Sequence, residues 1–236
     1  MIEIKHVTKK YGNKKALDNV SFNVADGEIF ALIGHNGAGK TTLIKAICGI
    51  HDFDQGTILI NGKSIKEDPI ACKKEMAYVP DDPELYEDMK AINFINFVCD
   101  MYDVSTPVRE RNIKRFTEMF NINSELNNPI KSFSHGMKQK IALIAALAHE
   151  PSVLIMDEPF VGLDPKAIFD MKEVMREMVK DGKTIFFSTH ILDVAEKLCS
   201  RVAIVKNGKI IETGDMDKVR GNKSLEKVFL ELEANE

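Results

Sequence analysis

The chain has 236 residues, of which 44% are hydrophobic and 29% are charged, a balance that favours one large folded domain or one domain with a helical insert. The net charge of −4 gives no general electrostatic case for nucleic-acid binding, so no nucleic-acid partner is expected. The longest unbroken apolar run, Ile141 to Ala148, is far shorter than the roughly 20 residues of a membrane-spanning helix. The four cysteines are scattered without a C-x-x-C pair and are predicted to be reduced packing residues in a cytosolic protein.

The first 33 residues are predicted to form short strands separated by turns. Val20, Phe22 and Val24 alternate with polar residues, which is typical of a half-buried strand. Asp26-Gly27 predicts a hairpin-type turn into an apolar strand at residues 29–33. Tyr11 precedes these elements and is expected to stand alone in a polar loop.

A glycine-rich segment follows this strand and fits the pattern G-x-x-x-x-G-K-[ST]. Its residues are Gly34, His35, Asn36, Gly37, Ala38, Gly39, Lys40, Thr41 and Thr42. The apolar-periodic residues 43–47 continue it as a predicted helix that ends at Gly49. Glycines let backbone N–H groups approach phosphates closely, and the N-terminus of the helix faces the same anion.

Two side chains of this segment complete a phosphate site. Lys40 supplies a mobile positive charge for the outer phosphates, and the Thr41 hydroxyl is placed to hold magnesium. The alternative is an ordinary glycine-rich turn between a strand and a helix. The fixed Lys-Thr pair and the flanking elements favour a nucleoside triphosphate site instead.

The middle of the chain is predicted to be helical. After a second hairpin around Asn61-Gly62, no glycine occurs between Lys63 and His135. Residues 91–101 and 108–120 have helical apolar periodicity. The predicted apolar faces comprise Ile92, Ile95, Phe97 and Val98 in the first helix and Ile113, Phe116 and Phe120 in the second. We expect a helical insert at residues 87–129 whose apolar faces are mostly core, with a smaller share for contact with a partner.

The rest of the chain alternates helices and strands. The predicted elements are a helix at 137–149, a strand at 153–156, a helix from Asp164-Pro165 to Asp181-Gly182, a strand at 184–187, a helix at 191–198 and a hairpin of residues 202–205 and 210–211 around Asn207-Gly208. This alternation implies an α/β fold with a mostly parallel sheet. Residues 215–236 are expected to form a charged helical tail.

Two carboxylates end the strand at residues 153–156. Because ligands bind at the carboxyl ends of strands in α/β sheets, Asp157 and Glu158 are candidates for chemistry. Asp157 is placed to hold magnesium through water, and Glu158 to accept a proton from an attacking water. A solvated acidic turn is the alternative; the buried run before the pair and the phosphate loop upstream favour function.

The motifs and their order resemble the nucleotide-binding subunit of an ATP-binding cassette (ABC) transporter, roughly from Ile2 to Gly214. Besides the phosphate loop and the acidic strand end, the matching segments are Lys9-Lys10-Tyr11-Gly12, similar to the aromatic loop that stacks on adenine; Phe133 to Lys140, similar to the L-S-G-G-Q signature; Gly162 to Pro165, similar to the loop that links two subunits; and Ser188-Thr189-His190, similar to the switch-histidine segment. The resemblance implies an α/β P-loop NTPase core with a mostly parallel sheet, an N-terminal antiparallel β subdomain and a helical insert. The implied division is a core of residues 1–86 and 130–214, a helical subdomain of residues 87–129 and a C-terminal helical tail of residues 215–236.

The resemblance also implies an ATPase that uses ATP and Mg²⁺. Two such subunits, identical or different, face each other head to tail and close on two ATP molecules. Ser134, His135 and Gly136 of one subunit then lie against the phosphate loop of the other. In the family pattern Tyr11 stacks on adenine and His190 binds the γ-phosphate and positions the water. The implied magnesium residues are Thr41, Asp81 and Asp157, and the implied catalytic residues are Glu158 and His190.

Two positions depart from the family pattern. Asp81 stands where a glutamine usually contacts magnesium and signals to the membrane subunit. We expect Asp81 to do this work with greater dependence on magnesium, because its carboxylate is a hard oxygen ligand that also adds negative charge beside the triphosphate. His135 replaces the first glycine of the signature, where it either donates to the γ-phosphate or crowds it. Because histidine titrates near neutral pH, it predicts pH-dependent activity.

We expect the chain to drive a separate integral membrane permease as a peripheral subunit at the cytoplasmic face of the cell membrane. By resemblance, residues 80–89 form the docking region. The sequences Tyr-Val-Pro and Gly-Met-Lys-Gln resemble the corresponding motifs of exporter cassettes, so export is the expected direction. One alternative is a soluble ABC ATPase acting on ribosomes or chromosomes, which typically has two cassettes or long coiled coils. The other is a weakly hydrolysing nucleotide-dependent regulator, against which Glu158 and His190 argue.

Overall fold

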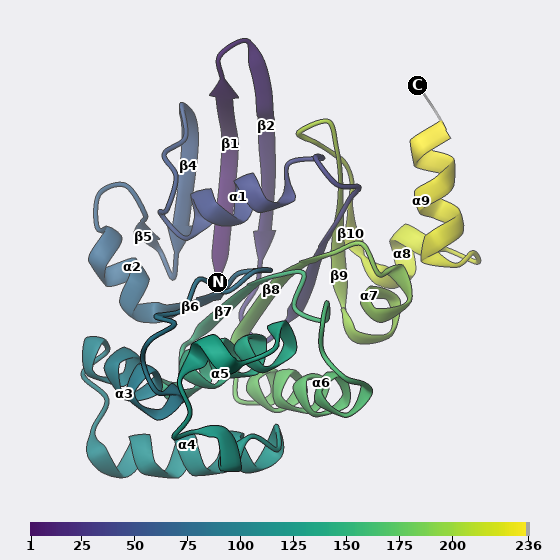
Figure 1. Cartoon of the computed structure of the whole chain (residues 1–236). Coiled ribbons are helices and arrows are strands. Elements are labelled where there is room, and N and C mark those ends of the chain that lie inside the picture. The colour runs from purple at the N-terminus through teal and green to yellow at the C-terminus, as the bar shows by residue number, and fades with distance from the viewer. Residues whose placement is uncertain (235–236) are drawn as a thin grey trace.

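The structure is a computed structural model that describes residues 1–234, and its main layers are two β-sheets (Figure 1). The antiparallel sheet has the strand order β2 (Lys14–Val24), β1 (Ile2–Tyr11), β4 (Gln55–Ile60) and β5 (Lys63–Ser64). The second sheet has the order β10 (Lys209–Asp215), β9 (Arg201–Lys206), β3 (Ile29–Ile33), β8 (Thr184–Thr189), β7 (Val153–Asp157) and β6 (Met76–Val79). Strands β9 to β6 are parallel to their neighbours, and β10 pairs antiparallel with β9. The predicted α/β fold with a mostly parallel sheet is confirmed.

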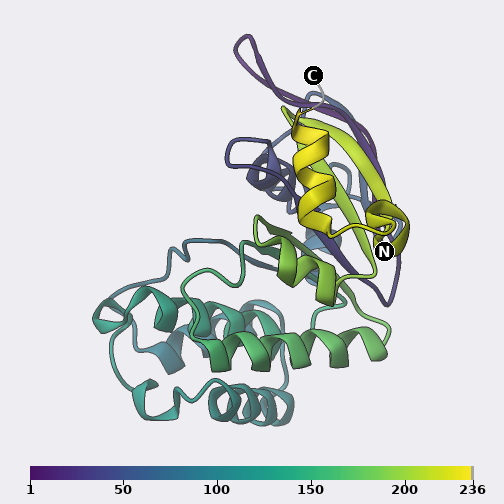
Figure 2. The same ribbon diagram turned by 90° about the vertical axis from the view of Figure 1, so that its right-hand side faces the viewer.

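Helices cover these sheets. They are α1 (Lys40–Ile47), α2 (Pro69–Glu75), α3 (Ala91–Met101), α4 (Thr106–Met119), α5 (His135–Ala148), α6 (Pro165–Lys180), α7 (Leu192–Leu198), α8 (Met216–Arg220) and α9 (Leu225–Ala234), with 3₁₀ turns at Asn123–Glu125 and Ile130–Ser132. Helix α1 lies between the two sheets, whereas α3 to α6 lie below the six-stranded sheet (Figures 1 and 2). Helix α9 stands beside the β9–β10 hairpin in both views.

The central strands are buried on both faces. In β3, Phe30 and Leu32 enter a core that fills the space between the two sheets and around α1. Ile29, Ala31 and Ile33 enter a second core that the helices below the sheet complete. A parallel strand covered on both faces needs no polar side, which explains the unbroken apolar run in the sequence. The phosphate loop therefore follows a strand that is packed against a core on each face.

Three aromatic rings join the two sheets. Phe22 of β2 stacks on Phe30 of β3 with ring centroids 5.2 Å apart. Phe186 of β8 lies 5.9 Å from both of these rings. Phe30 and Phe186 are fully buried, and Phe22 is buried. Because aromatic pairs add to the energy of area burial, this cluster fixes how the antiparallel sheet sits on the parallel one.

Most predicted helix ends and turns are confirmed. The turns at Asn61-Gly62 and Asn207-Gly208 close antiparallel hairpins. Asp164 caps α6 by accepting a hydrogen bond from the backbone N–H of Ala167 at 2.8 Å. The helix predicted at 137–149 begins earlier, at His135, because the Ser134 side chain caps it. Helices α8 and α9 lie in the segment predicted to be a helical tail; its predicted last residues, 235–236, lie outside the described part of the chain.

Three local predictions were wrong and one helix was missed. Asp26-Gly27 closes no hairpin, since β2 and β3 belong to different sheets and the turn carries the chain between layers. Tyr11 is the last residue of β1 and pairs with Lys14, so it lies in a strand and not in a loop. Phe97 is 38% exposed, because the buried stripe of α3 consists of Ala91, Ile95 and Cys99. The short, mostly polar helix α2 gave no clear apolar period.

The aromatic cluster yields a stability prediction. Phe186→Ala should lower the free energy of unfolding by about 3–5 kcal/mol, because it removes a fully buried ring and leaves a cavity between the sheets. Phe97→Ala, which truncates a partly exposed ring of the helical layer, is the control and should cost much less. Urea unfolding of both variants measures the difference. Equal losses would contradict the role given to the cluster.

Candidate functional site

The phosphate loop runs from β3 into α1 and is packed closely from behind. Gly39 caps α1 with a φ of 112°, a left-handed conformation that side chains rarely adopt. A Cβ added at Gly39 would stand 2.7 Å from the backbone oxygen of Ala16. The backbone N–H of Gly208 donates to the Ala38 carbonyl at 2.9 Å. The rear of the loop is thus anchored to β2 and to the β9–β10 turn.

A cavity of about 470 Å³ opens in front of this loop. It is lined by Tyr11, Lys14, Lys15, Ala16, His35, Asn36, Gly37, Gly39, Lys40, Thr41, Thr42, Asp81, Asp157, Glu158, Asn207 and Gly208. The cavity brings together most of the residues predicted for nucleotide and metal. Gly34 and Ala38 are buried behind the loop surface. Sequence reasoning missed Lys14, Lys15, Ala16, Asn207 and Gly208, since no motif marks them and only the tertiary fold brings them here.

Lys40 is held inside the site by an ion pair. Its ammonium lies 3.3 Å from Glu158 Oε1 and donates to the backbone oxygen of Gly34 at 2.7 Å. Both charged side chains are buried, with Lys40 6% exposed and Glu158 8% exposed. The other carboxylate oxygen of Glu158 accepts from the backbone N–H of His190 at 3.2 Å and lies 2.9 Å from Nδ1 of its ring. The predicted catalytic pair is therefore in direct contact, and its acid faces the phosphate-loop lysine.

The acidic end of β7 is fixed by the neighbouring strand. The hydroxyl of Ser188 donates to the carboxylate of Asp157 and accepts from the backbone N–H of Glu158, the latter at 3.1 Å. Ser188 and Asp157 are both buried. Glu158 has a φ of 46°, a conformation that is strained for a residue other than glycine and must be held by its surroundings. Ser188 belongs to the predicted switch segment, but its link to Asp157 follows only from strand register.

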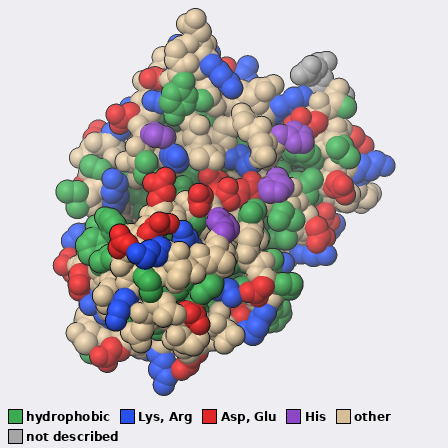
Figure 3. Space-filling model, viewed as in Figure 1, with side chains coloured by type: hydrophobic (Ala, Val, Ile, Leu, Met, Phe, Trp, Pro, Cys, Tyr) green, Lys and Arg blue, Asp and Glu red, His purple; other side chains and the backbone are tan. Residues whose placement is uncertain are grey.

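Asp81 faces the same acids from the end of β6. Partial burial, followed by the charges of Asp157 and Glu158, raises the pKa of Asp81 above its usual range, while His135 acts in the opposite sense. On the side of the molecule seen in Figure 3, acidic and histidine side chains gather across the middle. Within residues 1–234, no cluster of three or more His, Cys, Asp or Glu side chains is arranged to hold a metal alone. Magnesium commonly takes only one or two carboxylates and completes its shell with water and phosphate oxygens, so Asp157, Asp81 and the Thr41 hydroxyl fit such an ion beside a triphosphate.

His35 of the phosphate loop also contacts the C-terminal helix. Its Nε2 lies 3.5 Å from a carboxylate oxygen of Glu233 in α9. The His35 ring meets Phe229 edge-on, with ring centroids 4.9 Å apart. Helix α9 thus contacts the phosphate loop at His35, and no motif in the sequence marked this contact.

The signature residues do not line the cavity. Ser134 caps α5 by accepting from the backbone N–H of Met137 at 3.3 Å. His135 Nδ1 lies 3.6 Å from the Asp82 carboxylate, and Gly136 packs against the backbone of Gly162. Ser134 and His135 are exposed. One copy of the chain therefore keeps the signature residues outside the cavity that gathers most of the other predicted nucleotide residues.

Comparison with known proteins shows what the whole chain is similar to. A family model described as ABC transporter matches residues 17–161. The chain is 36% identical to the ABC-type transporter ATP-binding protein EcsA of Bacillus subtilis, covering 98% of this chain and 96% of EcsA. It is 33% identical to the linearmycin resistance ATP-binding protein LnrL of the same organism, over 91% of this chain and 69% of LnrL. A solved structure of an ATP-binding subunit of an ABC transporter superposes with a TM-score of 0.95, at 36% identity and 99% coverage of both chains.

The Ser188 hydroxyl yields a prediction about the site. Ser188→Ala should lower the free energy of unfolding by about 1.5–3 kcal/mol, because a buried carboxylate loses a hydrogen-bond donor. The control is Ser132→Ala, which removes an exposed hydroxyl that donates to the Pro129 carbonyl at 2.7 Å. Its loss should be about 1 kcal/mol or less. Chemical unfolding at neutral pH compares the two, and an equal loss would remove the special role of Ser188.

Proposed function

The chain belongs to the ATP-binding subunits of ABC transporters, and from this premise we propose that it pairs with a second such subunit, identical or different, and that the pair closes on two ATP–magnesium units to drive a separate membrane permease. As a member of this family it is an ATPase whose hydrolysis of ATP is coupled to transport. The observation that carries the proposal is that the signature residues Ser134 to Gly136 do not line the cavity of the same copy. A single copy can grip a triphosphate from one side only.

The phosphates are assigned to the loop at residues 34–42. Its backbone N–H groups and the start of α1 offer donors and a positive dipole to the anion. Lys40 supplies the charge, and the ring of Tyr11 at the mouth of the cavity is assigned to adenine. Tyr11 is half exposed, and the Lys9 ammonium lies 5.2 Å from its ring centre. This leaves a ring face for stacking and places positive charge beside it.

Magnesium is assigned to Thr41, Asp81 and Asp157. When bound, the ion supplies positive charge between the phosphate oxygens. The Ser188 hydroxyl orients Asp157 toward this position, while Asp81 approaches from the neighbouring strand end. Burial, together with the charges of Asp157 and Glu158, raises the pKa of Asp81, and the gathering of these three acids at the cavity supports a cation there.

Glu158 is assigned as the general base that accepts a proton from the attacking water. His190 holds one oxygen of its carboxylate, and the other oxygen faces Lys40. A triphosphate beside Lys40 competes with Glu158 for that ammonium. Glu158 is then free to turn toward a water, and His190 is placed to position the water and to contact the γ-phosphate. The hydrogen-bonded Glu158–His190 pair favours a hydrolysing enzyme over a weakly hydrolysing regulator.

The second grip comes from another subunit, identical or different. Ser134 and Gly136 lie at the start of α5, a 14-residue helix whose first backbone N–H groups have no partner within the helix. Head-to-tail closure brings this helix start to the γ-phosphate held by the other copy. His135 enters the same interface as an additional donor. Binding energy of the nucleotide thereby becomes closure of the dimer.

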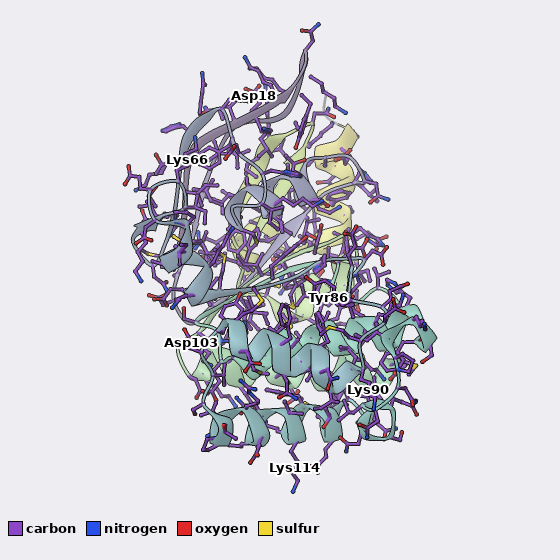
Figure 4. All side chains as sticks on the ribbon, turned by 60° about the vertical axis from the view of Figure 1, so that its left-hand side comes forward. Asp18, Lys66, Tyr86, Lys90, Asp103 and Lys114 are labelled. Carbon is purple, nitrogen blue, oxygen red and sulfur yellow. The ribbon has the colours of Figure 1, made fainter. Side chains whose placement is uncertain are left out.

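The permease is assigned to the loop that follows β6 and to α3. An apolar groove of about 160 Å³ lies there, with Pro83, Leu85 and Phe94 among its lining residues. Tyr86 is 60% exposed beside the groove and lies between the sheet layers and the helices below them (Figure 4). None of the helices within residues 1–234 is both long enough and apolar enough to cross a bilayer. A peripheral place at the cytoplasmic face of the membrane, bound to an integral permease through this groove, fits both observations.

Export is the direction we assign. The motif sequences resemble those of exporter cassettes, and the relative LnrL is named for resistance to linearmycin, which fits removal of a compound from the cell.

We assign the helical segment at residues 87–129 to the region that docks on the permease. Residues 215–234 are assigned as the tail that contacts the phosphate loop.

The dimer can be tested with Glu158→Gln. This variant keeps a side chain of the same shape but cannot accept the proton, so hydrolysis should fall at least 100-fold and bound ATP should persist. Size-exclusion chromatography with light scattering should show a dimer with ATP and magnesium and a monomer without nucleotide. Adding Lys40→Ala should abolish the dimer. The proposal fails if, with saturating ATP and magnesium, Glu158→Gln remains a monomer in solution and no permease is found bound to it in membranes.

The role of Asp81 can be tested by magnesium titration of the ATPase rate. Asp81→Gln should need a higher magnesium concentration than wild type to reach half-maximal rate, because a neutral amide replaces a negatively charged oxygen ligand of the metal. Glu84→Gln removes an exposed acid from the same loop and should titrate like wild type. Identical titrations for Asp81→Gln and wild type would show that Asp81 does not contact the metal.

A further inference from the structure

The turn between β9 and β10 lies between the phosphate loop and the antiparallel sheet. The backbone N–H of Gly208 donates to the Ala38 carbonyl at 2.9 Å. The Gly208 carbonyl accepts from the backbone N–H of Asp18 at 2.8 Å. Gly208 is buried, and both Asn207 and Gly208 line the nucleotide cavity. One residue of the turn thus links the loop that grips phosphate to the sheet that carries Tyr11.

The contact leaves no room for a side chain. A Cβ added at Gly208 would stand 2.6 Å from the Ala16 oxygen and 2.9 Å from the Ala16 carbonyl carbon. A Cβ at Gly39 would meet the same oxygen at 2.7 Å and would lie 3.5 Å from the Cα of Gly208. The Ala16 carbonyl is therefore enclosed by two glycines. All of these neighbours are backbone atoms, so none can move aside by rotating a side chain.

We propose that the Asn207-Gly208 turn is a positioning element of the ATP site: it sets the distance between the phosphate loop and the adenine side of the cavity, and Asn207 forms part of the wall. Residues this far along the chain belong to none of the motifs described above. The inference rests on the proposed contact between the phosphate loop and ATP. Displacing a preorganised loop by even a fraction of an ångström weakens binding of a ligand held by many converging donors.

The chain contains a matched control turn. Asn61 and Gly62 have φ values of 48° and 78°, and Asn207 and Gly208 have 49° and 77°. Both turns join antiparallel strands. A Cβ at Gly62 would meet no atom within 4 Å, and Asn61 and Gly62 do not line the nucleotide cavity. Gly→Ala therefore causes the same backbone strain in both turns but a collision only in the second.

The experiment compares Gly208→Ala with Gly62→Ala. For Gly208→Ala the KM for ATP and the Kd for ADP should rise about tenfold or more, while kcat stays within about threefold of wild type. Backbone strain should lower the stability of Gly62→Ala and of Gly208→Ala by a similar amount. For Gly62→Ala, however, the KM for ATP and the Kd for ADP should stay within about twofold of wild type. Steady-state ATPase assays and ADP titration give these values, and thermal melting checks the fold. Equal KM values for the two variants would overturn the inference.

A second variant keeps the test decisive if Gly208→Ala does not fold. Asn207→Asp retains a residue that tolerates positive φ, and it places a carboxylate on the cavity wall. Its affinity should fall most for ATP, less for ADP and least for adenosine, because the added charge acts on the phosphates. An equal effect on all three ligands, or none, would refute the assignment of Asn207. If the wild-type protein neither binds nor hydrolyses ATP, the proposed function fails; if it does both and the variants of the turn do not differ from it, only this inference fails.

Discussion

A buried ion pair between Lys40 and Glu158 holds the two halves of the site together. Two charges in so little solvent are tolerated only because each has several partners: the ammonium also donates to the Gly34 carbonyl, and the carboxylate accepts from His190. Separating the two side chains would leave a buried charge without compensation. The pair therefore holds the phosphate loop in place relative to the ends of β7 and β8. A triphosphate offers a new anion to the same lysine. In the proposed mechanism, Lys40 therefore couples occupancy of the loop to the freedom of Glu158.

The parallel sheet explains how residues so far apart in the chain reach this pair. The phosphate loop, the Asp157–Glu158 pair, the His190 segment and the Asn207 turn follow β3, β7, β8 and β9, and these strands run in one direction. Their carboxyl ends lie at one edge, which is where α/β sheets bind ligands. The antiparallel sheet brings Tyr11 and Lys14 to the same edge from another layer. The Phe22, Phe30 and Phe186 rings join this layer to the parallel sheet.

The sequence predicted what depends on local chemistry and failed where tertiary contacts decide. The motif around Lys40, the acids after the strand and the cap at Asp164 are local, and the structure places them as expected. Asp26-Gly27 has the residues of a hairpin turn, but turn chemistry does not say whether the flanking strands pair. Phe97 fits an apolar period that the layer below never covers. The links from Ser188 to Asp157 and from Gly208 to Ala38 depend on strand register and backbone approach, which no residue pattern records.

The two departures from the family pattern are neighbours in space, and each offsets part of the other. Burial is the main reason why the pKa of Asp81 is raised, and the negative charges of Asp157, Glu158 and Asp82 raise it further. The histidine at 135 lies 3.6 Å from Asp82 and, when charged, lowers the pKa of Asp81. A glycine at 135 would leave the acidic loop without this positive charge. A glutamine at 81 would reduce the negative charge that the histidine offsets. The loop assigned to the permease and the helix start assigned to the other subunit are thereby linked by charge within one copy, a connection that an uncharged glutamine and glycine do not make.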